Sequence, residues 1–344
     1  MQLETTPNTT AITAGKEYLF FSGTSYLGIS MLPEFQELVF KNIKKWGISY
    51  GSSRNANLKL NIYKKGENYL RNFLNSEDAI TVSSGTLASQ FALRALHNIV
   101  SGFYHMPKTH PSILSDTSNP VFVDFALNYS LKKLENKTIC IVTDAIAALE
   151  TDPFSFDFLQ EISSTNTIYV LIDESHSLGV LGKKGNGIAH QIQKTHNVQV
   201  ITVSSLGKAF GINGGVISGS TNFINSVKKD PLFIGSAGMN PAFLETFVNG
   251  ETIYTKQREK LKANIVFIYT KLVHLKEVTI SNNYPVFFFK NDAVAEYLYQ
   301  KNILITSFYY PSSSQKINRI VLNANHTKEQ LELLVKNLIA FSQR

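Results

Sequence analysis

The sequence has few of the features that would place it outside the cytoplasm. Among its 344 residues there is one cysteine, Cys140, so no disulfide can form within one chain. Cys140 stands in the apolar run 138–142, where a buried and unreactive thiol is expected. No apolar run approaches the roughly 20 residues that span a bilayer, and the first twenty residues lack the pattern of a signal peptide. These absences predict a cytoplasmic protein without a membrane span.

Charge of one sign is not concentrated anywhere. The formal charge of +7 is spread along the chain, and its densest pieces, 41–45 and 256–260, are typical of solvated helix faces. This pattern argues against a nucleic-acid-binding surface, whereas a modest positive field favours anionic substrates and cofactors. The composition, 43% hydrophobic and 17% charged, is that of a globular protein, and the length favours two lobes.

Strand and helix patterns alternate through the first two thirds of the chain. A strand at 78–82, a turn and a helix at 87–99 are followed by further apolar strand patterns, and such alternation predicts an α/β fold with a mostly parallel sheet flanked by helices. The further strands are expected at 120–125, 137–143, 167–172, 198–203 and 214–219.

The two ends of the chain have a different pattern. Residues 1–17 are polar and read as an exposed arm, a strand is expected at 18–21, and Pro33 opens a helix. A further helix is expected at about 62–74. The predicted domains are 1–45, an arm and helix; 46–240, a large domain; and 241–344, a smaller α+β lobe. In that lobe we expect helices at 241–274, 292–301 and 328–341, strands at 285–289, 303–308 and 319–322, and a loop at 311–314.

Ligands of open α/β sheets bind beyond the carboxyl ends of the strands, so the turns after Val82, Ile172 and Val203 are expected to converge. In the first turn, Ser84, Gly85 and Thr86 begin a helix whose amides and hydroxyls suit a phosphate. A simple helix cap by a serine explains the same pattern.

The second turn holds Asp173 and His176. A carboxylate there can keep the nitrogen of a pyridine ring protonated, which lets the ring accept electrons. A turn-capping Asp beside a surface His is an equally good reading. A metal site is the third reading, but no further ligand stands at a suggestive spacing, so no metal is predicted.

The third turn is centred on Lys208, between small and hydroxyl residues. Such a lysine can hold an anion as a point charge, or it can lose its proton and act as a nucleophile that forms a Schiff base. The surroundings of Lys208 do not match a phosphate-binding Walker loop, and the glycine-rich stretch 182–187 follows no strand and is read as a surface loop.

Taken in order, these motifs resemble the α-oxoamine synthases, which are fold-type I pyridoxal-phosphate transferases. The stretches Asp173-Glu174-Ser175-His176-Ser177-Leu178-Gly179 and Ser205-Leu206-Gly207-Lys208-Ala209-Phe210-Gly211 carry the resemblance. Weaker matches, from one end of the chain to the other, are Ser25-Tyr26-Leu27-Gly28, Gly51-Ser52-Ser53-Arg54, Ser84-Gly85, Thr109-His110-Pro111-Ser112 and Ala324-Asn325-His326-Thr327 with Arg319. Members include 8-amino-7-oxononanoate synthase, an enzyme of biotin biosynthesis, glycine acetyltransferase and serine palmitoyltransferase.

The resemblance implies a role for each matched residue. Lys208 would bind pyridoxal phosphate as a Schiff base and move the Cα proton, while Asp173 would pair with the ring nitrogen and His176 with the phenolic oxygen. His110 would stack on the ring. The cofactor phosphate would be held by Ser84, Gly85, Thr86, Ser205 and Ser236, and the amino-acid substrate by Arg319, Ser25 and Tyr26.

Several positions depart from the family pattern. Ser25 replaces an Asn that contacts the substrate in relatives, and Leu58 and Tyr63 replace a Gly and a His. In the stretch 145–150, Ala148 lacks a hydroxyl that normally lies near the cofactor, and Ala237 replaces a Thr that reaches the phosphate of the partner subunit. These changes put substrate identity in doubt more than cofactor chemistry.

The expected function is a decarboxylative condensation of a small α-amino acid with an acyl thioester such as an acyl-CoA. The resemblance also implies a homodimer with its active site at the subunit interface. Two alternatives stay open: an aminotransferase or other pyridoxal-phosphate enzyme of the same fold, and a homologue that binds the cofactor without turnover. The amino acid and the acyl chain are not indicated by any pattern.

Overall fold

The computed structural model describes residues 1–147, 149–193, 195–309 and 316–344. These residues form two compact units, which we describe separately. The larger unit comprises 36–208 and 212–251, and the smaller comprises 1–35, 209–211 and 252–344. The domain boundaries expected at 45/46 and 240/241 remain predictions, and the loop expected at 311–314 lies outside the described residues.

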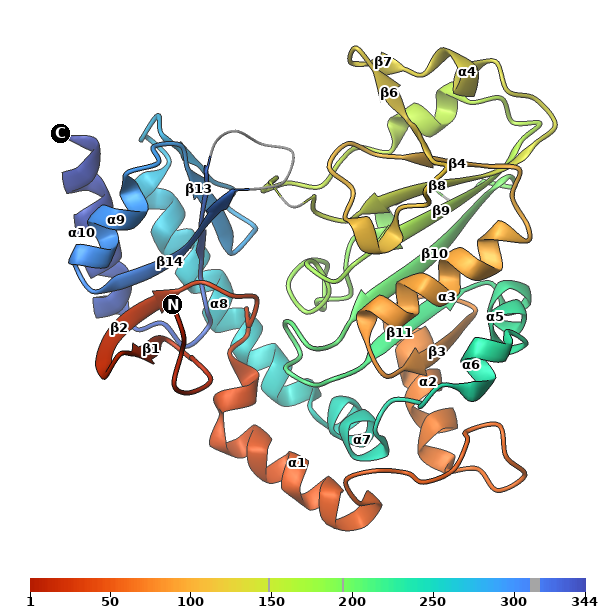
Figure 1. Ribbon diagram of the computed structural model, residues 1–344, viewed down its shortest axis with the longest axis horizontal. Helices are drawn as coiled ribbons and strands as arrows, with labels where there is room; N and C mark the ends of the chain where they lie inside the picture. Colours follow the sequence, from red (N-terminus) through yellow and green to blue (C-terminus); the bar gives the residue numbers. More distant parts are fainter. Residues whose placement is uncertain (148, 194, 310–315) are drawn as a thin grey trace. The chain divides into compact units, whose positions relative to one another are not determined.

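The larger unit is built on a seven-stranded sheet in the order β3-β11-β10-β9-β8-β4-β5 (Figure 1). The strands β10, β9, β8, β4 and β5 run parallel, and β11 is antiparallel to both of its neighbours. The mostly parallel sheet expected from the sequence is thereby confirmed. The strands are β3 (Asp78–Val82), β4 (Gly102–His105), β5 (Asn119–Pro120), β8 (Thr138–Asp144), β9 (Thr167–Asp173), β10 (Val198–Ser205) and β11 (Gly215–Gly219).

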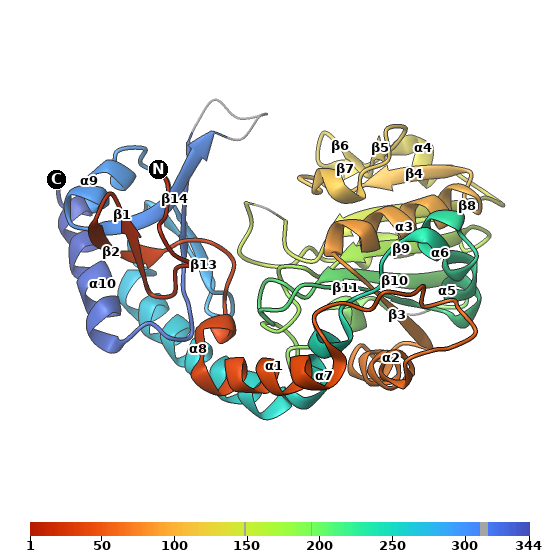
Figure 2. The ribbon, with the colours of Figure 1, turned by 60° about the horizontal axis from the view of Figure 1, so that its bottom comes forward.

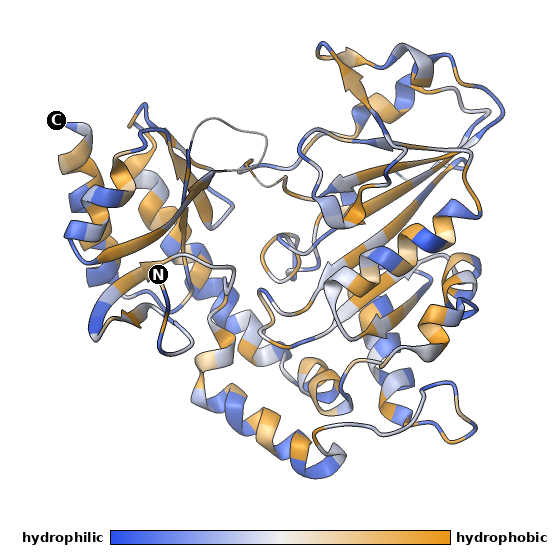
Figure 3. Cartoon of the chain, viewed as in Figure 1, coloured by the Kyte–Doolittle hydropathy of each residue, from blue (hydrophilic) through white to orange (hydrophobic). Residues whose placement is uncertain are grey.

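The central strands are apolar on both faces, because both faces of this sheet are covered (Figure 3). On one face, Cys140, Val142 and Leu171 pack with side chains of α3 (Gly85–His97) and α5 (Thr221–Lys228). Burial raises the pKa of the Cys140 thiol, consistent with an unreactive cysteine. On the other face, Ile141 and Val170 pack against short 3-10 turns and the segments around them. These turns are η3 (Asp157–Glu161) and η4 (Ala189–Gln191).

One expected strand is wrong and one was missed. The stretch 120–125 is divided between β5 and a separate hairpin, β6 (Phe122–Val123) with β7 (Ala126–Leu127). The strand that pairs with β8 is instead β4, which the sequence reading left out. Only four residues long and opened by Gly102, β4 has no alternating pattern to reveal it.

Figure 2 shows the remaining helices of the larger unit, of which α6 and α7 begin at capping side chains. Asn240 caps α7 by accepting hydrogen bonds from the backbone N–H of Ala242 and Phe243. Asp230 caps α6 by accepting from Leu232 N–H. The helices are α1 (Pro33–Trp46), whose first turn belongs to the smaller unit, α2 (Asn61–Phe73), the short η2 (Pro111–Ile113) and α4 (Tyr129–Lys132), α6 (Pro231–Gly235) and α7 (Pro241–Asn249).

The smaller unit has a six-stranded sheet in the order β1-β2-β14-β15-β13-β12. The exposed arm expected at 1–17 is wrong in part, because residues 10–13 form β1 and pair with β2, which pairs in turn with β14. The helix expected over 241–274 is two helices, which meet at Gly250. The elements are β1 (Thr10–Thr13), β2 (Lys16–Phe21), η1 (Ile29–Met31), α8 (Glu251–Leu272), β12 (Val278–Thr279), β13 (Val286–Phe289), α9 (Val294–Gln300), β14 (Ile303–Tyr309), β15 (Lys316–Val321) and α10 (Lys328–Ser342).

Candidate active site at the strand ends of the larger unit

Lys208 lies in a closed turn directly after β10. The turn is fixed by hydrogen bonds from Leu206 N–H to Gly214 O (2.9 Å) and from Ile212 N–H to Leu206 O (3.2 Å), and Leu206 is buried. The Nζ of the half-buried Lys208 lies 2.9 Å from Nε2 of His176, which follows β9. An amine and an imidazole are thus within hydrogen-bonding distance of each other, an arrangement that suits proton transfer.

Asp173 and Ser175 join the ends of β9 and β10. Asp173, the last residue of β9, is 8% exposed, and its Oδ1 accepts a hydrogen bond from Ser175 N–H (2.8 Å). The hydroxyl of Ser175 accepts a hydrogen bond from Ser205 N–H (2.8 Å). Two of the three turns expected to converge therefore do so through direct contacts.

The third turn, Ser84-Gly85-Thr86, also lies against Ser205. The Ser84 hydroxyl caps α3 by accepting a hydrogen bond from Leu87 N–H (3.2 Å). The interpretation of this serine as a helix cap is therefore correct. Gly85 is packed so closely that a Cβ on it would lie 2.6 Å from Cβ of Ser205. The first amides of α3 have no partner inside the helix, and they lie at its positive end. An anion can be held between these amides and the Ser205 hydroxyl.

A carboxylate that the sequence reading missed completes this edge of the sheet. Asp144 ends β8, lies opposite Asp173 in the parallel register, and is 7% exposed. Its Oδ2 accepts a hydrogen bond from the backbone N–H of His110 (2.6 Å). Burial and the neighbouring Asp173 raise the pKa of Asp144 to about 7. The signal was present, since Asp144 closes an apolar strand just as Asp173 does.

His110 is an exposed residue whose ring is held by its own turn. Its Nδ1 accepts a hydrogen bond from Ser112 N–H (3.1 Å) and lies 2.7 Å from the Ser112 hydroxyl. Both contacts of Nδ1 hold the ring against its own turn.

The carboxylate of Glu174 holds the segment that directly follows the glycine-rich loop 182–187. It is fully buried, and its carboxylate accepts hydrogen bonds from Ser177 Oγ–H and from the N–H groups of Ile188 (2.7 Å) and Ala189 (2.5 Å). Burial raises its pKa to about 7. Gly187, the last residue of this loop, has no room for a side chain, since a Cβ on it would lie 2.4 Å from Oε2 of Glu174.

Other predicted site residues lie apart from this group. Ser236 follows α6 and donates a hydrogen bond from its hydroxyl to Phe233 O (3.0 Å), and no hydrogen bond joins it to the Lys208 turn in the described part of the chain. Ala148, the residue lacking a hydroxyl, lies outside the described residues.

The predicted substrate residues belong to the smaller unit. Arg319, on β15, donates hydrogen bonds to the hydroxyl of buried Tyr26 (3.0 Å) and to Gly23 O (3.2 Å). Ser25 stands beside Tyr26 in the same turn and is half-buried. Within this unit a guanidinium, a phenol and a hydroxyl residue are therefore close in the fold, which suits recognition of a carboxylate.

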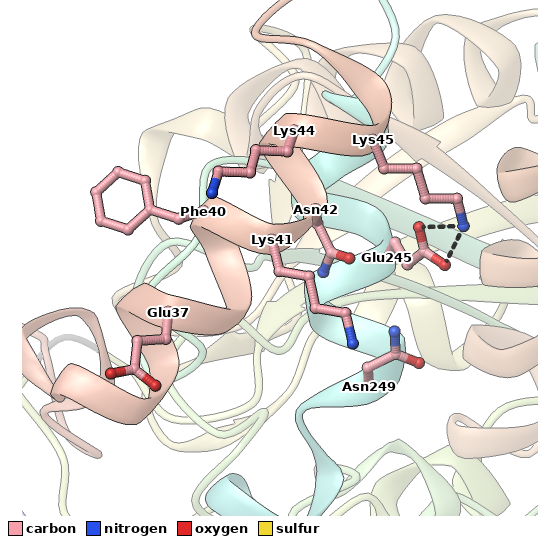
Figure 4. A pocket seen from close by; sticks show the side chains of 8 residues that line it. All are labelled: Glu37, Phe40, Lys41, Asn42, Lys44, Lys45, Glu245 and Asn249. Atoms are coloured by element: carbon pink, nitrogen blue, oxygen red, sulfur yellow. Dashed lines mark hydrogen bonds and ion pairs between the residues drawn. The ribbon is translucent and has the colours of Figure 1, made fainter.

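A surface groove of about 810 Å³ lies between α1 and α7 and contains none of the predicted site residues (Figure 4). The polar side chains at this groove join α1 to α7, because Lys45 Nζ donates to both carboxylate oxygens of Glu245 (2.8 and 2.9 Å) and Asn42 Nδ2 donates to the Thr246 hydroxyl (2.9 Å).

The described residues contain no cluster of three His, Cys, Asp or Glu able to hold a metal ion. Nor does any helix within them have the length and apolar character to cross a membrane.

The chain belongs to the aminotransferase class I and II family, whose model matches residues 21–338. Over 344 residues it is 25% identical to the 8-amino-7-oxononanoate synthase of Petrotoga mobilis, covering 92% of this chain and 86% of that protein. Over 360 residues it is 26% identical to the serine palmitoyltransferase of Bacteriovorax stolpii, covering 97% and 84%. The resemblance to α-oxoamine synthases that the motifs carry is confirmed by these relatives.

Solved structures show the same fold. A serine palmitoyltransferase from S. paucimobilis with a bound PLP–myriocin aldimine matches with a TM-score of 0.82 and 17% identity, over 99% of this chain and 92% of that one. The 8-amino-7-oxononanoate synthase of Francisella tularensis matches with a TM-score of 0.73 and 21% identity, over 95% and 97%. The predicted fold-type I transferase architecture is thereby confirmed.

Proposed function

We propose that this chain is a pyridoxal-phosphate-dependent acyltransferase that condenses a small α-amino acid with an acyl thioester and releases CO₂. The observation that carries the proposal is the contact between Lys208 and His176, at the strand edge that also holds Asp173. The relatives named 8-amino-7-oxononanoate synthase and serine palmitoyltransferase support an α-oxoamine synthase.

The residues at this edge fit pyridoxal phosphate, which has an anionic phosphate, a basic ring nitrogen and an aldehyde. The start of α3, with Ser84, Gly85 and Thr86, and the Ser205 hydroxyl suit the phosphate. The buried carboxylate of Asp173 suits a protonated ring nitrogen. Lys208 supplies the amine for the aldehyde.

When bound, the cofactor supplies a protonated ring that delocalises the electron pair left on Cα of an amino acid. Asp173 holds the proton at the ring nitrogen, and the start of α3 orients the ring by its phosphate. Lys208 removes and returns the proton at Cα, and His176 orients the Lys208 amine and donates to the phenolic oxygen. His110 would stack on one face of the ring.

Arg319 would hold the substrate carboxylate, with Tyr26 and Ser25 beside it. The expected acyl donor is an acyl-CoA. We further propose a cytoplasmic homodimer in which Ser236 reaches the cofactor phosphate of the partner subunit. The molar mass in solution tests the dimer, and a monomer that binds the cofactor fully would contradict it.

Spectroscopy of the purified protein tests the cofactor assignment. Protein saturated with pyridoxal phosphate should show the visible absorbance of the cofactor bound to a lysine. Lys208→Ala should lose that absorbance, because it removes the amine that bonds the aldehyde of the cofactor. Lys183→Ala, which removes an exposed amine from the loop 182–187, is the matched control and should keep it. Retention of the absorbance in Lys208→Ala would refute the assignment.

A substrate screen tests the reaction. Glycine, alanine and serine are each combined with acyl-CoAs of increasing chain length, and free CoA is measured. Release of CoA that needs both substrates supports the condensation. Conversion of the bound cofactor to its amine form by an amino acid, reversed by a keto acid and without CoA release, would favour an aminotransferase. Cofactor binding without exchange of the Cα proton of any of the three amino acids would favour a non-catalytic homologue.

A further inference from the structure

Two buried carboxylates lie side by side at the carboxyl edge of the sheet. The parallel register of β8 and β9 places Asp144 opposite Asp173, and Ala145 N–H donates to Asp173 O (2.9 Å). Asp144 is 7% exposed and Asp173 8%. Like charges this close and this poorly solvated do not both ionise readily, so the pair favours one negative charge over two.

Asp144 also reaches the segment that carries His110. This segment leaves β4, where Met106 N–H donates to Val142 O (3.0 Å), and turns through Thr109 to His110. The His110 backbone N–H donates to Asp144 Oδ2 at 2.6 Å, whereas the His110 ring contacts Ser112 of its own turn. At His110 itself, the contact with the sheet is therefore made by the Asp144 carboxyl group.

We propose that Asp144 is a positioning residue of the site: it anchors the His110 turn to the sheet and shares one negative charge with Asp173. The proposal rests on the function proposed above. Two groups face Asp144 from the neighbouring elements, Asp173 on β9 and Lys208 after β10. His176 contacts the Lys208 amine in turn. On β4, His105 turns away to Ser118. Burial and Asp173 favour the protonated form of Asp144, in agreement with its raised pKa.

Two variants at this position should behave differently. Asp144→Asn presents an amide oxygen to His110 N–H and an N–H to Asp173, as a protonated carboxyl group would. It therefore keeps the anchor and removes the charge that appears at higher pH. Asp144→Ala removes both the anchor and the charge. Asp144→Leu fills a similar volume without an acceptor and replaces the alanine variant if that variant does not fold.

The anchor is tested by hydrogen exchange of the protein without added cofactor, followed by mass spectrometry of peptides that cover 106–118. Asp144→Asn should keep wild-type protection of this segment, and Asp144→Ala or Asp144→Leu should speed exchange there by about tenfold. Asp116→Asn removes an exposed carboxyl group from the same segment and is the matched control, with unchanged exchange. Wild-type protection in the alanine and leucine variants would overturn the proposal.

The shared charge is tested by the pH at which the visible absorbance of bound pyridoxal phosphate reaches half its maximum. Ionised Asp144 favours positive charge on the Lys208 nitrogen, so Asp144→Asn should shift this midpoint downward by about half a pH unit, a threefold change in proton concentration. A purely structural residue would leave the midpoint unmoved, and an unmoved midpoint overturns the charge sharing. If wild-type protein binds no pyridoxal phosphate, the proposed function fails, while hydrogen exchange still decides whether Asp144 anchors the His110 turn.

Discussion

Gly85 is the residue at which helix α3 comes closest to the end of β10. A Cβ at this position would lie 2.6 Å from Cβ and 2.8 Å from Cα of Ser205, and backbone atoms do not yield at low cost. We predict that Gly85→Ala lowers the free energy of unfolding by about 1–3 kcal/mol, as overpacked sites do. Because Ser205 must shift, cofactor affinity should fall as well. Thermal unfolding and cofactor titration measure the two effects.

The control for this prediction is Gly235→Ala, since a Cβ on Gly235 meets nothing within 4 Å. This substitution should change stability by no more than about 0.5 kcal/mol and leave cofactor affinity unchanged. If Gly85→Ala bound the cofactor as tightly as Gly235→Ala, the phosphate would not be held at the start of α3.

Single residues of the site differ in how visible they are in the sequence. Lys208, Asp173 and His176 could be picked out because each ends or follows an apolar strand, and strand ends of a parallel sheet meet at one edge. Asp144 also ends an apolar strand but belongs to no motif, so the sequence did not indicate it as a site residue. Asp144 contacts His110 by accepting a hydrogen bond from its backbone N–H, and no sequence pattern indicates such a contact.

Between elements, a buried ion pair joins the loop before α2 to α2 and β3. Arg54 donates to Glu67 Oε1 (2.5 Å) and to Thr81 O (2.5 Å), and the guanidinium lies 4.6 Å from the ring centre of Tyr63. Tyr63 in turn donates a hydrogen bond to Met239 O (2.9 Å), on the segment that leads into α7. The departure at Tyr63 thus has a physical role here, because its ring packs against Arg54 and its hydroxyl ties α2 to this segment.

We predict that Arg54→Ala lowers the free energy of unfolding by about 3 kcal/mol, because it leaves Glu67 buried without its cation. The side chains of Arg54 and Glu67 are 9% and 14% exposed. Lys132→Ala is the matched control: its pair with Glu161 is about half exposed on both sides, so the cost should stay below about 1 kcal/mol. Urea unfolding measures both, and equal costs would contradict a buried role for Arg54.

Elements with strong periodicity were predictable, and short ones were not. The apolar runs that became β8, β9 and β10 were found with small errors at their ends. The sequence predicts one strand over 120–125 because the turn between β6 and β7, Asp124-Phe125, has positive φ at both residues (49° and 65°) without the Asn-Gly signal of such turns. The strand β1 was hidden because it is stabilised by pairing with β2 and not by an apolar pattern of its own.

For the molecule as a whole, three buried groups tie stability to pH in opposite directions. The pKa values of Asp144 and Glu174 are raised to about 7, mainly by burial, so the folded state binds more protons than the unfolded chain between about pH 4 and 7. Their contribution to stability is therefore lost as pH rises through this range. His326, buried and bonded to Asn323 N–H and Phe20 O, has a pKa lowered to about 4 by burial. Its contribution is lost as pH falls from about 6.5 to 4.

Because these contributions oppose one another, we predict that removing one of them changes the slope of the free energy of unfolding against pH. In Glu174→Gln, the amide oxygen still accepts from Ile188 and Ala189 N–H and the amide nitrogen donates to Ser177 Oγ, so these contacts remain while the titration disappears. Relative to wild type, its free energy of unfolding should rise by roughly 2–4 kcal/mol between pH 4.5 and 7.

His326→Asn keeps an acceptor for Asn323 N–H but removes the imidazole, so its profile should tilt the other way. Whatever its absolute stability, its free energy of unfolding relative to wild type should fall by roughly 2–4 kcal/mol as pH rises from 4 to 6.5. Urea unfolding of both variants at a series of pH values measures the slopes, and each variant is the control for the other. Parallel profiles for wild type and both variants would show that these buried groups do not govern the pH dependence of this fold.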